Sequence, residues 1–218
     1  MAAGEGKRLR PLTLETPKPL LKIKGRPILD YTFSSLPEKI SEVILVVGYK
    51  GEQIKNYLGG EFSGKKIKYV FQGRPGGTFH ALASAKNLLA PDPFLVLVAD
   101  DLYKKEDLEE LARHPAGVLV FETATPERFG ICKIGESGFL EEITEKPDYF
   151  CGNLANTGAC VLDHAVFEEP IIYGANGEEL LAPMIGSLAK SQKIKVIQGS
   201  FWFPIGYPED LEKAEEFI

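Results

Sequence analysis

The 218-residue sequence has little cysteine and no long apolar run. Its three cysteines, Cys132, Cys151 and Cys160, are an odd number at spacings that match no zinc motif. This argues against a disulfide framework and favours reduced thiols in a cytoplasmic protein. No apolar segment approaches the length of a membrane span, and the N-terminus lacks the apolar core of a signal peptide. We therefore expect no membrane partner.

Basic residues are fewer than acidic ones over the whole chain, but they are concentrated at its start. Lysine and arginine number 25 against 31 aspartates and glutamates, which gives a formal net charge of −6. The acidic residues are spread along the chain, so we expect no nucleic-acid partner. Residues 1–26, in contrast, carry seven basic residues and only two acidic ones. A local patch of this kind suits a small anion.

Apolar runs of strand length alternate with segments of helical spacing in the first half of the chain. We expect strands at 42–47, 67–72, 94–99 and 117–123, and helices at 50–58, 77–89 and 104–113. This alternation predicts an α/β fold with a parallel sheet covered on both faces.

The pattern changes beyond residue 125 to shorter strands broken by glycine and proline. Segments 130–134, 138–146 and 156–163 predict an antiparallel insertion over one edge of the sheet. The remaining elements expected are a helix at 177–190, a strand near 194–199 and a last helix from Pro208. No repeat or linker separates these parts, so we expect one domain over residues 1–218.

The opening loop, "AAGEGKRLRP", has the composition of an anion site without a known fingerprint. Leu9 stands where a dinucleotide fingerprint needs its third glycine, and no Ser or Thr follows Lys7 as in a P-loop. Gly4 and Gly6 still let backbone N–H groups approach an oxyanion, and Arg8 adds a fork that matches phosphate oxygens. A flexible basic N-terminus is the alternative.

Lys18 follows within a few residues, in "TPKPLLKIKG". Pro17 and Pro19 predict an extended, stiff frame that presents the Lys18 ammonium. The alternative, an ordinary solvated lysine, is disfavoured because apolar Leu20 and Leu21 would anchor the stretch beside it.

Two more candidate sites fall at predicted strand ends, where open α/β sheets bind ligands. Asp100 follows strand 94–99 and is placed to hold Mg²⁺, which takes few protein carboxylates and completes its shell with water and phosphate oxygens. A role as N-cap or turn residue is the alternative, and it fits Asp101 better. Gln72 ends another strand, and its amide can bond a base edge, although a plain strand-turn-helix joint explains this position equally well.

The sequence contains no Ser/His or Cys/His constellation that indicates a protein nucleophile. Its three histidines fall in helical or turn contexts, and we expect structural roles for them. They are His80, His114 and His164.

Several short motifs, each weak alone, occur together in one order. They are "AAGEGKRLRPLT", "TPKPLLKIKGRPIL", "FQGRPGGTFHAL", "LVADD", "RFGICKI", "ITEKP", "NLANTG" and "WFPIGYPEDLEKA". With these motifs the chain resembles the sugar-1-phosphate nucleotidylyltransferases along nearly its whole length. The resemblance implies a Rossmann-like, three-layer α/β/α fold with a small antiparallel insertion. It also implies a Mg²⁺-dependent reaction in which an NTP and a sugar 1-phosphate give an NDP-sugar and pyrophosphate.

The resemblance also implies residue roles by position. Arg8 would hold the triphosphate, Lys18 would bridge the α-phosphate and the sugar phosphate, and Asp100 would bind Mg²⁺. The other nucleotide-binding residues implied are Gly4, Gly6, Gln72, Gly77 and Thr78. The sugar-side residues implied are Gly130, Glu145, Lys146, Asn156 and Thr157.

Two positions depart from the family's pattern. Family members commonly carry an Asp or Asn that binds Mg²⁺ where this chain has Pro204. The family's opening loop also follows a central strand, whereas here Met1 stands where that strand ends. We therefore expect the first central strand to be missing from this sequence and the native protein to begin earlier. A strand lent by another protomer and a rearranged sheet edge are the alternatives.

Three functions follow as hypotheses. The leading one is sugar-nucleotide synthesis, with dTTP or UTP and glucose 1-phosphate favoured over guanylyl transfer to mannose 1-phosphate. A cytidylyltransferase for a non-sugar phosphate is the second, and a catalytically silent regulatory paralogue that binds nucleotide-sugars is the third. We expect a nucleotide-binding half at 1–124, a sugar-binding half at 125–204 and a C-terminal helix at 205–218, in a possible homo-oligomer.

Overall fold

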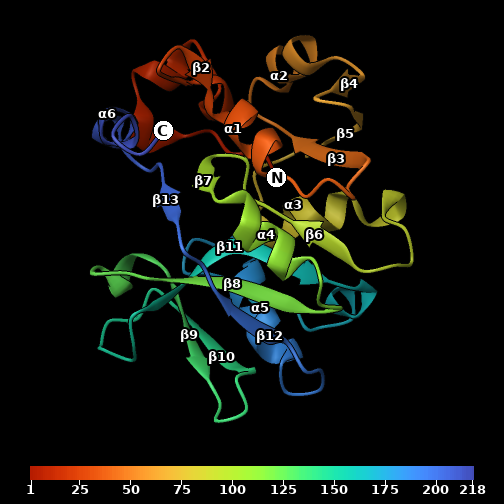
Figure 1. Cartoon of the computed structure of the whole chain (residues 1–218), viewed down its shortest axis with the longest axis vertical. Helices are drawn as coiled ribbons and strands as arrows, with labels where there is room; N and C mark the ends of the chain where they lie inside the picture. Colours follow the sequence, from red (N-terminus) through yellow and green to blue (C-terminus); the bar gives the residue numbers. More distant parts are fainter.

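Most strands lie in two separate sheets in the structure, a computed structural model that describes residues 1–218 (Figure 1). The smaller sheet has the order β3-β5-β4, formed by β3 (Glu42–Val47), β5 (Lys65–Phe71) and β4 (Glu61–Phe62). β3 and β5 are parallel and stay in register along the whole of β3. The run "EVILVV" suits a strand because β-branched side chains pack well on a pleated surface, and its last three residues are buried.

The larger sheet has the order β10-β9-β11-β8-β12, with β6 also paired to β11. Its strands are β6 (Phe94–Val96), β8 (Gly117–Glu122), β9 (Gly130–Ile134), β10 (Leu140–Glu145), β11 (Leu154–Leu162) and β12 (Lys195–Gln198). β11 is antiparallel to both β6 and β8, whereas β12 is parallel to β8. Two small sheets complete the fold, β1 (Lys22–Ile23) with β2 (Arg26–Pro27) and β7 (Asp101–Tyr103) with β13 (Trp202–Pro204).

The α/β class is confirmed, but the expected parallel sheet is only partly right. β11 does not lie over an edge: Cys160 pairs with Val96 of β6 on one side and with Val118 of β8 on the other. A buried strand needs partners for its backbone groups, and this central position supplies them on both sides. The larger sheet is therefore mostly antiparallel, with the β9-β10 hairpin at one end and the parallel pair of β8 and β12 at the other.

The first two residues lie between the two sheets, at the middle of the molecule (Figure 1). The Ala2 N–H donates to the Val46 carbonyl at 2.7 Å, and the Ala99 N–H donates to the Met1 carbonyl at 3.0 Å. The Met1 amine donates to the Leu97 carbonyl at 2.6 Å. These bonds join the end of β3 to the segment that follows β6.

Six α-helices pack around the sheets. They are α1 (Ile28–Ser35), α2 (Gly51–Leu58), α3 (Thr78–Ser84), α4 (Lys105–Leu111), α5 (Leu181–Leu188) and α6 (Pro208–Ala214). Short 3-10 turns are η1 (Lys7–Leu9), η2 (Leu12–Leu14), η3 (Lys18–Leu20), η4 (Lys86–Leu88), η5 (Pro126–Arg128) and η6 (His164–Phe167). None of the helices has both the length and the apolar character needed to cross a membrane.

The expected helix at 177–190 begins only at Leu181. The Glu179 N–H donates to the Gly76 carbonyl at 2.8 Å, and the Glu179 carbonyl accepts from the Phe79 N–H at 3.0 Å. Both backbone groups of Glu179 are therefore used in a non-helical contact with the start of α3, which delays the helix.

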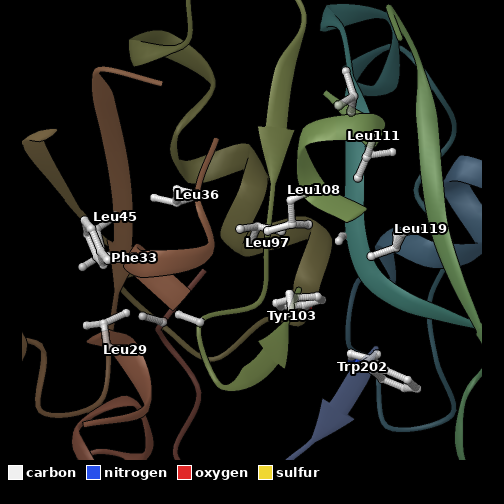
Figure 2. Close-up of a cluster of buried hydrophobic side chains, with 14 of the residues drawn as sticks. Leu29, Phe33, Leu36, Leu45, Leu97, Tyr103, Leu108, Leu111, Leu119 and Trp202 are labelled. Carbon is white, nitrogen blue, oxygen red and sulfur yellow. The ribbon is translucent and has the colours of Figure 1, made fainter. Parts of the chain in front are cut away.

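A continuous apolar core joins the two halves of the molecule. Figure 2 shows it running from Leu29 and Phe33 of α1 through Leu97 to Leu119 of β8 and Trp202 of β13. A second buried cluster lies between α5 and the larger sheet. Because the core is shared, loops from both halves are held in fixed relation to one another.

Candidate functional site

A cleft of about 660 Å³ opens between the start of the chain and the β9–β11 side of the larger sheet. All thirteen residues singled out from the sequence line it. They are Gly4, Gly6, Arg8, Lys18, Gln72, Gly77, Thr78, Asp100, Gly130, Glu145, Lys146, Asn156 and Thr157. The structure thus gathers the predicted residues in one place, while their roles stay predictions.

The opening loop is held by its glycines and one threonine. Gly6 has φ 61°, in the left-handed region that favours glycine. A β-carbon there would lie 2.9 Å from Thr13 Cγ2, and Thr13 Oγ1 donates to the Gly6 carbonyl at 2.9 Å. Gly4 has no neighbouring atom within 4 Å of such a β-carbon, so it leaves open space on the cleft side.

Arg8 is the basic side chain of this loop that no carboxylate neutralises. Glu5 lies 3.4 Å from Lys7 Nζ and 3.7 Å from Arg10 Nη2, whereas Arg8 makes no ion pair. The Arg8 guanidinium lies over the Tyr207 ring, 5.2 Å from its centroid. Stacking on a ring positions a guanidinium without using its N–H donors.

Arg128 is a second guanidinium at the same ring that the sequence reasoning missed. It lies 5.1 Å from the Tyr207 centroid, lines the cleft and makes no ion pair. Its only sequence signal is its place in "RFGICKI", because charge alone does not distinguish it from a solvated arginine. The cleft therefore has two free guanidinium groups at one end.

Lys18 and Asp100 meet at the cleft surface. Lys18 Nζ donates to Asp100 Oδ2, and the two side chains are 11% and 31% exposed. Pro17 is extended as expected, but Lys18 itself begins the turn η3 instead of continuing an extended frame. This turn buries the lysine stem and leaves the ammonium at the cleft.

Asp101 is not the N-cap or turn residue that the sequence suggested. It belongs to β7, is buried, and accepts a hydrogen bond from Trp202 Nε1 at 3.0 Å. Burial, and then the charge of neighbouring Asp100, raise the pKa of Asp101 to about 7. Asp101 thus ties β13 to the core, and Asp100 is the more exposed carboxylate of the two.

The donor set at Asp100 fits Mg²⁺. Asp100 Oδ1 accepts no hydrogen bond from the protein, and its side chain remains partly exposed. No group of three or more His, Cys, Asp or Glu side chains forms a metal cluster, and Pro204, opposite Asp101 in the β13-β7 pair, has no side-chain oxygen. A single carboxylate suits Mg²⁺, which keeps several water or phosphate ligands.

Gly77 and Thr78 join the start of α3 to the segment before α5. Gly77 has φ 96°, and a β-carbon there would lie 2.4 Å from the Glu179 carbonyl oxygen. Thr78 Oγ1 accepts a hydrogen bond from the Leu181 N–H at 2.9 Å. Both residues therefore have a structural task in addition to lining the cleft.

Gln72 is held at the end of β5 by three contacts. Its backbone N–H donates to the Val47 carbonyl at 2.7 Å. Its side-chain Nε2 lies 2.8 Å from His80 Nδ1 and 3.4 Å from the Gly77 carbonyl oxygen. His80 was expected to be structural, and the structure places it in direct contact with a predicted base-binding residue.

On the opposite side of the cleft, a carboxylate and an ammonium lie together. Gly130 pairs with Glu145 across β9 and β10, and a β-carbon on Gly130 would lie 3.0 Å from Glu145 Oε2. Lys146 Nζ lies 3.5 Å from Glu145 Oε1. Together they offer hydrogen-bond acceptors and donors of the kind that bind hydroxyl groups.

A register shift in β11 brings Asn156 and Thr157 to the cleft. Asn156 Oδ1 accepts from the Gly158 N–H at 3.1 Å, which leaves its amide NH₂ free. The Thr157 hydroxyl donates to the Leu119 carbonyl at 2.9 Å, and Thr157 is only 2% exposed. Asn156 is therefore the available donor of the two, and Thr157 holds the shifted backbone.

Comparison with known proteins gives consistent matches. The family model described as nucleotidyl transferase matches residues 1–218. The bifunctional protein GlmU of Methanocaldococcus jannaschii is 34% identical over 100% of this chain and 53% of its own length. The UTP–glucose-1-phosphate uridylyltransferase AglF of Haloferax volcanii is 34% identical over 99% of this chain and 93% of its own length.

A solved structure shares the fold. A Bacillus anthracis protein described as a glucose-1-phosphate thymidylyltransferase, solved with sucrose, is 25% identical with a TM-score of 0.86. The match covers 99% of this chain and 92% of that one. The chain spans about half the length of the GlmU relatives it matches.

Proposed function

This chain belongs to the nucleotidyl transferase family, and we propose that it transfers a nucleotidyl group from a nucleoside triphosphate to a sugar 1-phosphate, releasing pyrophosphate. The observation that carries the proposal is the meeting of Arg8, Lys18 and Asp100 in one cleft with Glu145 and Asn156. The same cleft thus contains cations that suit phosphate groups and polar side chains that suit sugar hydroxyls.

The residues of the cleft suit a direct displacement at phosphorus. An oxygen of the sugar phosphate attacks the α-phosphorus in line with the leaving pyrophosphate, and both reactants are anions. Lys18 offsets their repulsion between the two phosphates, and Arg8 binds the outer phosphates that leave. Because these cations have fixed positions, they orient the two reacting phosphates. Orientation of reactants can lower an activation barrier by up to about 7–11 kcal/mol in favourable cases.

Asp100 is the residue proposed to hold Mg²⁺, which when bound neutralises phosphate charge. Lys18 has a second task before substrate binds, because its ion pair keeps the Asp100 carboxylate in one position. The Trp202–Asp101 hydrogen bond fixes the backbone from which Asp100 projects.

The preferred substrates are UTP or dTTP with glucose 1-phosphate. The activities after which AglF and the Bacillus anthracis protein are named support this choice. We further propose that residues 1–124 supply the nucleotide side and residues 125–204, apart from Arg128, the sugar side, with residues 205–218 as the C-terminal segment that contains α6. Tyr207 at the start of that last segment contacts both guanidinium groups.

A second candidate function rests on Pro204. Because this residue lines the cleft and offers no side-chain oxygen, the chain has one metal-binding carboxylate where the family commonly has two ligands. The loss of a metal ligand would be tolerated in a catalytically inactive paralogue that only binds nucleotide-sugars.

An assay of pyrophosphate release separates these functions. The protein is incubated with Mg²⁺, each of the nucleoside triphosphates, and glucose 1-phosphate, mannose 1-phosphate or phosphocholine. Release with UTP or dTTP and glucose 1-phosphate is expected. Pyrophosphate release only with CTP and phosphocholine would instead indicate a cytidylyltransferase for a non-sugar phosphate. Binding of UDP-glucose without pyrophosphate release from any pair would favour the catalytically silent paralogue.

A further inference from the structure

We propose that His80 is a positioning residue that sets base preference by fixing the orientation of the Gln72 side-chain amide. The inference rests on the proposed function, because it assumes that Gln72 faces the base of a bound nucleotide. His80 does not line the cleft, whereas Gln72 does. His80 therefore acts on a ligand only through Gln72.

Two acceptors hold the nitrogen end of this amide. Gln72 Nε2 lies 2.8 Å from His80 Nδ1 and 3.4 Å from the Gly77 carbonyl oxygen. A carbonyl can only accept a hydrogen bond, so its place beside Nε2 assigns the nitrogen to that side. His80 Nδ1 then accepts as well, which puts the proton of the neutral ring on Nε2 of His80.

The His80 ring is itself held in place. A β-carbon on Gly76 would lie 2.5 Å from His80 Cγ, so the ring packs directly against the Gly76 backbone. His80 sits in the first turn of α3, and its carbonyl accepts a hydrogen bond from Ser84 Oγ at 2.8 Å. The ring nitrogen is thus presented to Gln72 from a rigid element.

The oxygen end of the amide is left for a ligand. Gln72 Oε1 has no hydrogen-bond partner in the protein, and the only buried side-chain polar atom without a partner is Gln192 Oε1. Gln72 Oε1 is therefore accessible to solvent. With both Nε2 protons directed at His80 and Gly77, the amide presents an acceptor to the cleft.

A fixed acceptor discriminates between bases by their ring nitrogens. Uracil, thymine and guanine carry an N–H at the ring position next to a carbonyl, which can donate to Oε1. Cytosine and adenine have a lone pair at the corresponding ring nitrogen, which faces Oε1 unfavourably. By fixing Gln72, His80 favours bases with a ring N–H (imide-type: uracil, thymine and guanine) over bases with a ring lone pair (amino-type: cytosine and adenine). If the Gln72 amide could rotate by 180°, much of this preference would be lost.

Nucleotide binding measured by calorimetry tests this without requiring turnover. Dissociation constants are measured for two pairs of nucleotides, UTP with CTP and GTP with ATP. Each pair is measured in the native protein, H80L and H80N. In H80N an amide oxygen can replace the Nδ1 acceptor, so the preference should be retained. In H80L the ratio of dissociation constants for the preferred pair should fall about tenfold, as expected for one lost oriented hydrogen bond. N87A, at an exposed position in η4 outside the cleft, should leave the ratio unchanged.

The outcomes separate this inference from the proposed function. A native protein that prefers an imide-type nucleotide, with the ratio kept in H80L, would overturn the role of His80 and leave the proposed function standing. Equal weakening of both members of a pair in H80L would assign His80 a purely structural role. A native protein that binds no nucleoside triphosphate would overturn the proposed function and this inference together.

Discussion

The residues at the cleft fall into two groups by how they were found. Arg8 and Lys18 were predicted from the sequence because glycines and prolines around a cation indicate a shaped backbone. Arg128 and His80 were not, because each is distinguished by a side-chain partner: Tyr207, far along the chain, for Arg128, and Gln72, across the connection between β5 and α3, for His80. A short sequence motif can predict the local backbone conformation. Which side chains contact each other depends on the tertiary structure.

Replacing Lys18 tests the proposed centre of the reaction. We predict that Lys18→Ala lowers kcat by about 10²- to 10³-fold, the range for removing one preorganised charge from a transition state. The melting temperature should change little, because Asp100 is partly exposed and can be solvated when its partner is lost. Lys22→Ala, at an exposed lysine in β1, is the control and should keep full turnover. Equal rates for the two variants would contradict the assignment of Lys18.

Arg128 has a separate test in the reverse reaction. We predict that Arg128→Ala raises the KM for pyrophosphate about tenfold, as expected for one lost charge-assisted hydrogen bond. Arg113→Ala is the matched control, because Arg113 is exposed just after α4 and pairs with Glu110 of that helix at 2.7 Å. An unchanged KM for pyrophosphate in Arg128→Ala would show that this guanidinium does not contact the leaving group.

At the scale of elements, the boundaries of β3 and β9 agree with the sequence prediction, whereas those of α3 and α5 do not. β3 and β9 are bounded by local polar and glycine signals. The start of α5 is set instead by the backbone of Glu179, which bonds to residues about one hundred positions away. Contacts of that range leave no periodic signal in the sequence.

Gly77 provides the element-scale prediction. Gly77→Ala should lower the free energy of unfolding by about 2 kcal/mol or more, because it adds backbone strain and a close contact with the Glu179 carbonyl. Gly64→Ala is the control: Gly64 also has positive φ, 73°, but open space around its β-carbon position. Urea denaturation should therefore show the larger loss for Gly77→Ala. Equal losses would mean that α3 and the segment before α5 are not closely packed.

For the whole molecule, the α/β class followed from the alternation of strands and helices, but the strand order did not. Sequence periodicity shows that a strand is buried and does not show which neighbours bury it. For that reason the sequence did not predict that β11 lies between β6 and β8, and the strand was expected over an edge. The cleft nevertheless contains all thirteen residues that the motifs indicated.

The buried cluster between α5 and the larger sheet, which contains Cys132 and Cys160, leads to a prediction about the three free thiols. Burial raises the pKa of Cys132 and Cys160 to about 12, so both stay protonated and unreactive at about pH 8. Cys151 is partly exposed. Titration with a thiol reagent should therefore modify one cysteine per chain in the native protein and all three in urea. Rapid modification of all three without denaturant would contradict the packing of the larger sheet.

The fate of an isotopic label shows whether the protein transfers the nucleotidyl group, which includes the α-phosphate, to the sugar phosphate. Each nucleoside triphosphate is labelled at either the α- or the γ-phosphate and incubated with the protein, Mg²⁺ and a sugar 1-phosphate. We expect the α-label in the NDP-sugar and the γ-label in pyrophosphate, with UTP or dTTP and glucose 1-phosphate as the preferred pair. Absence of α-label from every sugar nucleotide across the full set of pairs would contradict it.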